Sequence, residues 1–132
     1  MDYFDIHAHP DQIRGVSTLG LAHIGDAVFE LMVRSRLCLH GKATNKGLHR
    51  ATVALVAAPA QARMAQKILP ILTEEEMAVY RRGRNQSPHA VPKAAFRGEY
   101  QSATGVEALF GDLWLRGERE RLNVLFERMM EE

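Results

Sequence analysis

The sequence predicts an all-α protein, a bundle of six or seven helices in one domain. Apolar residues recur at three- and four-residue steps along most of the chain, which is the period of a helix with one buried face. No stretch shows the strict alternation of a convincing strand. The 132 residues suffice for one helical core but not for two. We expect an N-terminal arm at residues 1–17 and a helical domain at residues 18–132.

Composition excludes several classes of protein. Seventeen Lys and Arg against sixteen Asp and Glu give a formal net charge of +1, so a polyanion site must come from local clustering. No apolar run approaches the roughly 20 residues of a membrane span, and the N-terminus does not resemble a signal peptide. Cys38 is the only cysteine and lies in an apolar stretch, which favours a buried thiol in a reducing compartment. We therefore expect a cytoplasmic protein without membrane contact.

The arm contains the segment Asp5-Ile6-His7-Ala8-His9-Pro10, which has the residue types of a metal site. An aspartate with a His-x-His pair can bind a metal in a barrel of typically about 250 residues, which supplies the other ligands. This chain has only 132 residues. We therefore interpret the segment as a terminal arm, and its role stays open.

The first long helix is expected from Ser17 or Thr18 to about Leu39. Either hydroxyl side chain can accept a hydrogen bond from a free amide of the first turn, so both are good N-caps. The helix should stop at His40-Gly41, because glycine is the usual residue past a helix end. A polar turn should follow at residues 42–47.

Three shorter helices are expected in the middle of the chain. Prolines delimit the first two, at residues 48–57 and 60–69, because proline cannot continue a helix interior. The third begins at a capping box, in which Thr73 caps the amide of Glu76 and the Glu76 side chain reaches back. That helix should end near residue 83, and a loop should follow to residue 92.

Two helices complete the chain, at about residues 102–115 and 119–130, with Gly117 between them. The last has apolar residues at helical spacing, which predicts one buried face. These residues are Leu122, Leu125, Phe126 and Met129.

Two acids lie among apolar helical positions, Asp26 in the first long helix and Glu107 in the helix at 102–115. Gly25 and other small residues beside them allow a close approach of two helices. Two inward acids on crossing helices form a site for a hard divalent cation, because positive charge relieves their repulsion and desolvation. The alternative is a pair of buried carboxylates satisfied by arginine or by helix-end amides.

The segments around these acids resemble a known family. Ile24-Gly25-Asp26-Ala27-Val28 and Val106-Glu107-Ala108-Leu109-Phe110-Gly111 are similar to the two signature helices of ribonuclease III endonuclease domains. The compact branch of that family, Mini-ribonuclease III, is closer still, through Arg81-Arg82-Gly83-Arg84-Asn85 and Ala103-Thr104-Gly105-Val106-Glu107-Ala108-Leu109. The resemblance extends from about Leu19 to the C-terminal helix.

The resemblance implies a ribonuclease III helical bundle and a Mg²⁺-dependent endoribonuclease that cleaves double-stranded RNA. Asp26 and Glu107 are then the catalytic residues and the metal ligands. The ion polarises the scissile phosphate, lowers the pKa of a bound water and stabilises the leaving oxygen. The family role is the maturation of the large-subunit (23S) ribosomal RNA precursor, with a large-subunit ribosomal protein as a possible partner.

Two positions depart from the four acids that the wider family usually shows: Ala22 and Thr104 stand where it has carboxylates. We expect water and phosphate oxygens to fill more of the Mg²⁺ shell. Thr104 and Glu30 are candidates for holding such a water, although Glu30 can equally be solvated or paired with arginine. The departures leave open an alternative function, a non-catalytic RNA-binding or ribosome-assembly factor on the same scaffold.

Basic residues are the candidates for RNA contact. Arg81, Arg82 and Arg84 with Asn85 gather where a helix ends before a proline-containing loop. Such an end can contact the phosphates and 2′-hydroxyls of A-form RNA, which is recognised mainly by shape. Most charge runs are only solvated faces, and the resemblance is the reason to prefer RNA contact here. The other candidates are Lys46, Lys93 and Arg97.

Larger members of the family carry a separate domain for double-stranded RNA, and no residues after Glu132 are left to form one. We therefore expect the catalytic domain itself to bind RNA, as a homodimer that presents one site to each strand. Candidate interface residues are Phe29, Met32 and Trp114.

Overall fold

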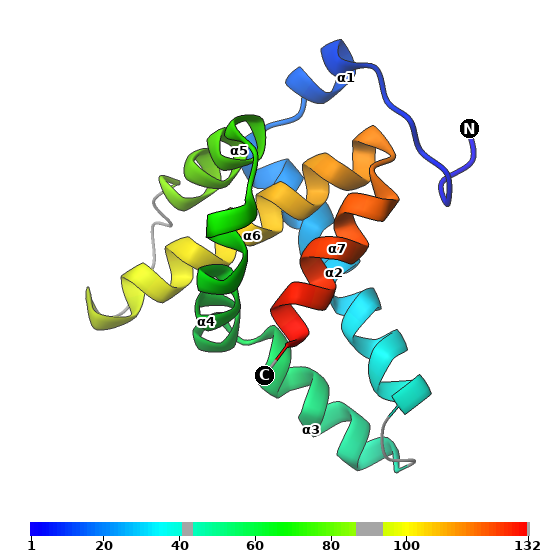
Figure 1. The fold of residues 1–132 in the computed structure, drawn as a ribbon, viewed down its shortest axis with the longest axis vertical. Coiled ribbons are helices and arrows are strands. Elements are labelled where there is room, and N and C mark those ends of the chain that lie inside the picture. Colours follow the sequence, from blue (N-terminus) through cyan, green and yellow to red (C-terminus); the bar gives the residue numbers. More distant parts are fainter. Residues whose placement is uncertain (41–43, 87–93, 132) are drawn as a thin grey trace.

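The computed structural model describes residues 1–40, 44–86 and 94–131, the side chains of 94–96 excepted. Over these ranges the chain forms α-helices and one short 3₁₀ helix, with no strand, so the predicted all-α bundle is confirmed (Figure 1). The elements are α1 (Pro10–Arg14), α2 (Thr18–His40), α3 (Asn45–Val56), α4 (Ala58–Ile68), η1 (Leu69–Ile71), α5 (Glu74–Arg84), α6 (Ala94–Arg116) and α7 (Arg119–Met130).

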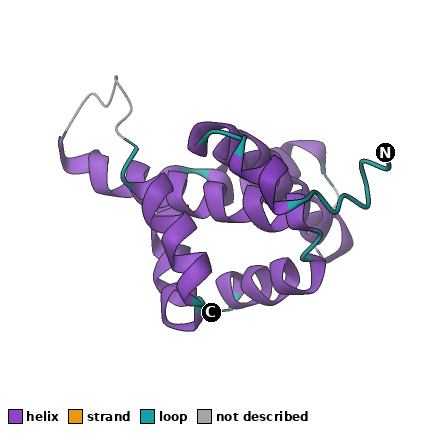
Figure 2. Ribbon diagram, turned by 90° about the horizontal axis from the view of Figure 1, so that it is seen from above, coloured by secondary structure: helices purple, strands orange, loops and turns teal. Residues whose placement is uncertain are grey.

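The two longest helices, α2 and α6, cross at the centre of the bundle and make its most extensive contact. Helices α4 and α5 pack along α6, and α7 packs against both α4 and α6 (Figure 1). Seen from above, the N-terminal segment runs along the outside of the bundle (Figure 2). None of the described helices is long and apolar enough to cross a membrane.

Backbone contact between α2 and α6 fixes this crossing. A Cβ atom at Gly25 would lie 1.6 Å from the carbonyl oxygen of Glu107, and one at Gly111 would lie 1.9 Å from that of Leu21. Real Cβ atoms are not found at such distances, so only glycine permits the two helices to come this close. The crossing therefore places the residue after Gly25 next to Glu107.

The hydrophobic core surrounds the crossing. Phe29 is fully buried, and its ring makes edge-to-face contacts with Phe110 and Phe126, at centroid distances of 5.7 and 5.9 Å. The expectation that Phe29 is free for a dimer interface is therefore wrong. Because α2, α6 and α7 converge at this ring, Phe29 is a core residue.

Several helices begin earlier than the sequence pattern indicates. Helix α3 starts at Asn45 rather than at residue 48, because the Thr44 side chain caps it and accepts a hydrogen bond from the Gly47 amide at 3.1 Å. Helix α4 starts at Ala58, since Pro59 lies in its first turn, where a proline needs no amide partner. Helix α6 starts at residue 94 and not at 102. Most of the expected loop, residues 87–92, lies outside the described residues.

The predicted capping box at the start of α5 is confirmed. The Thr73 amide donates to Glu76 Oε1 at 2.9 Å, and the Glu76 amide donates to Thr73 Oγ1 at 3.1 Å. Arg121 of α7 donates two further hydrogen bonds to the Glu76 carboxylate, both at 2.8 Å. Burial raises the pKa of Glu76, but the bonds from Arg121 and Thr73 outweigh it, and the net pKa is lowered. The pair therefore fixes α5 to α7 as an ion pair.

Cys38 is exposed, and its predicted burial is wrong. Leu37, Cys38 and Leu39 follow one another in the last turn of α2, and a helix can turn only one face toward the core. Leu37 packs against the core, so its neighbours point outward.

The arm lies against the end of α6 and the start of α7. The Ala8 amide donates to the carbonyl of Leu115 at 2.7 Å, and Asp5 accepts a hydrogen bond from Arg119 at 3.1 Å. His7 Nε2 lies 2.9 Å from Asp5 Oδ1, and His9 caps α1. The polar residues of this segment therefore hold the arm in place.

Candidate active site

Asp26 on α2 and Glu107 on α6 meet at the edge of the glycine crossing. Their carboxyl groups are close enough to share a hydrogen bond. Glu107 is half-buried, but Asp26 is exposed, so the prediction that both acids point inward is wrong for Asp26. Gly25 itself occupies the buried contact with α6, which leaves the next residue at the rim. The pair therefore opens toward the surface, where a large substrate can reach it.

The surroundings of Glu107 disfavour its charged form. Burial, together with the hydrogen bond and the negative charge of Asp26, raises the pKa of Glu107 to about 8. Among the described residues, no lysine, arginine or histidine forms an ion pair with either acid. This disfavours the alternative of carboxylates satisfied by arginine. Positive charge from outside the described chain would stabilise both acids in their ionised form.

The donor set fits a hard divalent cation. Carboxylate oxygens are the ligands that Mg²⁺ prefers, and Mg²⁺ keeps several waters when a protein offers few ligands. The described residues contain no group of three or more His, Cys, Asp and Glu side chains that could hold a metal. A cation at this site would therefore have two protein carboxylates, Asp26 and Glu107, and would complete its shell with water and substrate oxygens.

A recess of about 190 Å³ adjoins Glu107, between α6 and the start of α4. Thr104, one turn before Glu107, lines it, and the Thr104 hydroxyl donates to the Tyr100 carbonyl at 2.9 Å. The other residues that line it are Val56, Ala58, Gln61 and Ala103.

Gln61 belongs to this recess, and the sequence analysis missed it. It lies on the buried face of α4 and is only 2% exposed. Its Nε2 donates to the carbonyl of Val56 at 2.9 Å, whereas its Oε1 is buried without any hydrogen-bond partner. A polar residue on the apolar stripe that Ala60, Met64 and Ile68 define was the signal in the sequence.

Glu30 and Asp112 both form ion pairs with arginine. Glu30 lies 3.0 Å from Arg34, one turn further along α2, which agrees with the arginine-paired interpretation of this residue. Asp112 is 4% exposed and pairs with Arg116 at 2.8 Å, on the side of α6 that faces the start of α5.

The basic end of α5 packs on α6 one turn before Glu107. Arg81, Arg82 and Arg84 are exposed in its last turn, and Asn85 is its C-cap. Gly83 packs on α6, where a Cβ atom would lie 2.8 Å from the carbonyl oxygen of Thr104, one turn before Glu107. This close contact brings three of the predicted RNA-binding arginines to the same part of α6 as Glu107.

The remaining basic candidates lie further away or outside the described chain. Arg97 is exposed on α6, about 15 Å along the axis from Glu107 at the rise of an α-helix. Lys46 is exposed in the first turn of α3, whose start packs near Arg34 and Cys38 at the far end of α2. Lys93 lies outside the described residues.

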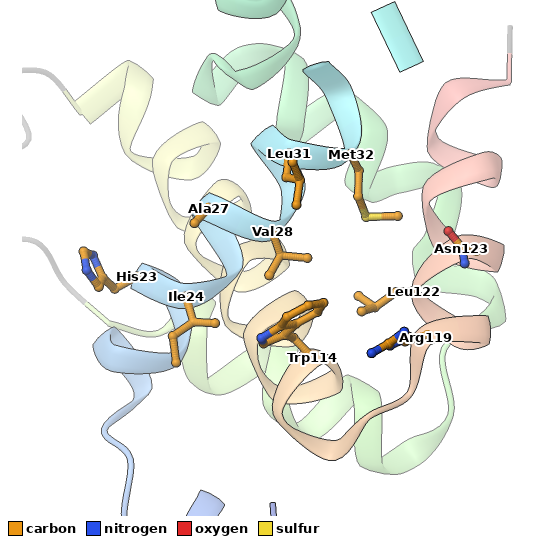
Figure 3. Close-up of a pocket in the computed structure, with 10 residues that line it drawn as sticks. All are labelled: His23, Ile24, Ala27, Val28, Leu31, Met32, Trp114, Arg119, Leu122 and Asn123. Carbon is orange, nitrogen blue, oxygen red and sulfur yellow. The ribbon is translucent and has the colours of Figure 1, made fainter. Parts of the chain in front are cut away.

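A second hollow, of about 540 Å³, lies between α2, α6 and α7 and is mainly apolar (Figure 3). Met32 and Trp114 project into it beside Leu122, and Leu31 at its rim is 57% exposed. Two of the three residues expected at a dimer interface therefore share one surface, which we call the apolar groove. Its other lining residues are His23, Ile24, Ala27, Val28, Arg119 and Asn123.

The helical fold and the paired acids together define a class of protein. Comparison with known proteins identifies this class. Residues 19–118 match the Ribonuclease III domain, and the chain therefore belongs to the ribonuclease III family. Its closely similar relatives are in the compact branch. Mini-ribonuclease 3 of Symbiobacterium thermophilum is 47% identical over 105 residues, which cover 80% of this chain and 81% of that protein.

Two further relatives agree with this placement. Mini-ribonuclease 3 of Gloeobacter violaceus is 46% identical over 116 residues, covering 88% of this chain and 84% of that protein. The X-ray structure of a protein from Fusobacterium nucleatum superposes with a TM-score of 0.77 at 30% identity, over 88% of this chain and 93% of that one. The resemblance to Mini-ribonuclease III is confirmed, and the chain is an endoribonuclease of the ribonuclease III type.

Proposed function

We propose that the protein cleaves double-stranded RNA in a Mg²⁺-dependent reaction and that it acts in maturation of the large-subunit (23S) ribosomal RNA precursor. The contact between Asp26 and Glu107 is the observation that carries this proposal. It supplies two carboxylate ligands at a site that opens to the surface, and no basic side chain of the described residues forms an ion pair with either of them.

Asp26 and Glu107 are the residues that would hold the ion. When bound, Mg²⁺ polarises the scissile phosphate, lowers the pKa of a water and stabilises the leaving oxygen. Glu107 gives up its proton when the site is filled, because both carboxylates then act as ionised ligands. The backbone contact at Gly25 and Gly111 fixes the backbone positions of the two acids relative to each other, which limits the reorganisation that the reaction requires.

Arg81, Arg82, Arg84 and Asn85 bind the RNA in this proposal. Their position at the end of α5, packed one turn from Glu107, suits contact with phosphates on either side of the scissile bond. Guanidinium groups bind phosphates in a bidentate manner, and A-form RNA is recognised through its backbone and 2′-hydroxyls. Arg97, exposed on α6, is a further RNA contact in this proposal, and Lys46 and Lys93 are the other basic candidates.

A homodimer completes the proposed enzyme, since one domain of this size presents only one such site. The apolar groove with Met32 and Trp114 is the interface that we propose, and a second copy of the chain is its occupant. A two-fold axis at this groove brings α2 of one protomer against α2 of its partner and places one pair of acids on each strand.

The biological assignment rests on the family resemblance. A precursor of ribosomal RNA contains long duplex stems, and we place the protein in the bacterial cytoplasm, where that RNA is made. A large-subunit ribosomal protein that presents the stem is the further partner in this proposal.

Cleavage of a duplex RNA by Asp26→Asn and Glu107→Gln variants tests the proposal. Each should lower the rate by more than about 100-fold, because even residues that only support metal ligands account for about 10–100-fold. Circular dichroism and RNA binding in EDTA should stay close to the wild type. Glu127→Gln on the exposed face of α7 is the matched control and should cleave normally. A near-normal rate in either site variant would refute the assignment.

The alternative that Ala22 and Thr104 left open, a non-catalytic RNA-binding or ribosome-assembly factor, does not agree with the placement of the chain among the endoribonucleases of the ribonuclease III family. Ala22 is buried on α2, and Thr104 hydrogen-bonds within its own helix, so neither supplies an acid. The same assay tests this point: binding of duplex RNA without any product in either Mg²⁺ or Mn²⁺ would contradict the proposed cleavage.

A further inference from the structure

The unpaired oxygen of Gln61 is the one buried polar side-chain atom of the described residues that has no hydrogen-bond partner. Buried polar atoms nearly always have such a partner, in the protein or in an ordered water. The bond from Nε2 to the Val56 carbonyl fixes the orientation of the amide, so the oxygen cannot exchange places with the nitrogen. Gln61 therefore requires a donor that its protein neighbours do not provide.

The recess that Gln61 shares with Glu107 is rich in acceptors. Glu107 contributes a carboxylate, and the Thr104 hydroxyl already donates to the Tyr100 carbonyl. The volume of about 190 Å³ is sufficient for water, because a molecule in the liquid takes about 30 Å³. Water bound to a cation is a strong donor, since the ion polarises its O–H bonds.

We propose that Gln61 is a positioning residue of the cation site. Its amide oxygen accepts a hydrogen bond from a water that lies in the recess between Gln61 and Glu107 and belongs to the hydration shell of the ion. The inference rests on the proposed function, and it deepens that function. It assigns to α4 a part of the site that Asp26 and Glu107, on α2 and α6, do not form alone.

A neutral acceptor suits this place better than a third acid. Another carboxylate beside Asp26 and Glu107 would add a third negative charge to the site and increase the repulsion within it. The amide oxygen orients a water without adding charge. Gln61 thereby compensates in part for the acids that positions 22 and 104 lack.

The affinity for Mn²⁺, measured by isothermal titration calorimetry, tests the inference. Gln61→Leu should weaken binding by about 10–100-fold, the usual effect of removing a group that orients a metal-bound ligand. Gln66→Leu makes the same replacement at an exposed position of α4 and should bind like the wild type.

Cleavage kinetics provide the second readout. In Gln61→Leu, the Mg²⁺ concentration for half-maximal cleavage should rise by the same factor as the Mn²⁺ dissociation constant. RNA affinity in EDTA should not change, because Gln61 is buried and does not reach the duplex.

Wild-type Mn²⁺ affinity in a folded Gln61→Leu variant would overturn the inference. A crystal structure of the wild-type protein with Mn²⁺ decides the question even if that variant does not fold. Density for a water at about 2.7–3.2 Å from Gln61 Oε1 supports it, and an ion without such a water refutes it. If Mn²⁺ does not bind between Asp26 and Glu107 at all, both this inference and the proposed metal site fail, whereas a bound ion without the water leaves the proposed function standing.

Discussion

Replacing Glu107 with glutamine should stabilise the folded protein above neutral pH when no divalent cation is present. Glutamine keeps the size of the side chain and can still donate a hydrogen bond to Asp26, but it cannot ionise. The wild-type protein must either bury a second negative charge beside Asp26 or keep a proton on Glu107. The variant avoids both, although it loses the metal ligand.

The sign and size follow from the pKa of Glu107, which rises from 4.5 to about 8 on folding. Between these values the folded state holds a proton that the unfolded state has released, so stability falls as the pH rises through this window. Each pKa unit corresponds to about 1.4 kcal/mol, which sets an upper limit of about 5 kcal/mol. Because Asp26 is exposed and its charge is screened by water, we expect about 2–3 kcal/mol.

Urea unfolding followed by circular dichroism, in EDTA between about pH 5 and 9, measures this effect. The free energies of unfolding of wild type and Glu107→Gln should diverge by about 2–3 kcal/mol across the range, in favour of the variant at high pH. Adding Mg²⁺ at high pH should stabilise the wild type, by about 2.7 kcal/mol at 100 times its dissociation constant, and leave the variant unchanged. Parallel stability curves for the two proteins would show that Glu107 does not titrate in this window and would refute the reasoning.

The remaining predictions concern the crossing, the basic end of α5 and the apolar groove. Gly25→Ala should lower the free energy of unfolding by more than about 3 kcal/mol, because its Cβ would overlap the Glu107 carbonyl. Gly98→Ala on α6, where a Cβ meets nothing within 4 Å, should instead gain about 0.5–1 kcal/mol in urea unfolding. Arg81→Ala should reduce the slope of log affinity for duplex RNA against log salt concentration by about 1, whereas Arg128→Ala on α7 should leave it unchanged. Met32→Glu should convert the proposed dimer to monomers in sedimentation velocity, with a change in the fluorescence of Trp114, the only tryptophan. An unaltered sedimentation coefficient would show that the groove is not the interface.

The helix boundaries were predictable where local sequence signals, such as a capping residue, mark them. The Thr73 and Glu76 capping box fixes the start of α5 through local hydrogen bonds, and the sequence shows it directly. The start of α6 at residue 94 was not predictable in this way, because no cap or apolar stripe distinguishes its first turns. Local signals define helix ends well where they are present. The start of a long helix such as α6 has few such signals.

The site was predictable as a pair of acids but not in its geometry. Gly25 beside Asp26 indicated a close helix contact, but the sequence could not tell which of two adjacent residues the contact would bury. Phe29 was assigned to a surface because its place depends on Phe110 and Phe126, which lie far along the chain. Gln61 was missed because its unpaired oxygen becomes visible only when the walls of the recess are assembled.

The contact between Gly25 and Gly111 also makes the spacing of the two acids independent of the length of the chain that connects the two helices. The spacing of the acids is set within a few ångströms of the acids themselves, so insertions or deletions between α2 and α6 need not alter it. Related enzymes can therefore diverge in the length and sequence of α3 and of the linkers while inheriting the same spacing of the acids, provided that the two glycines are retained and α4 still presents Gln61 to the recess.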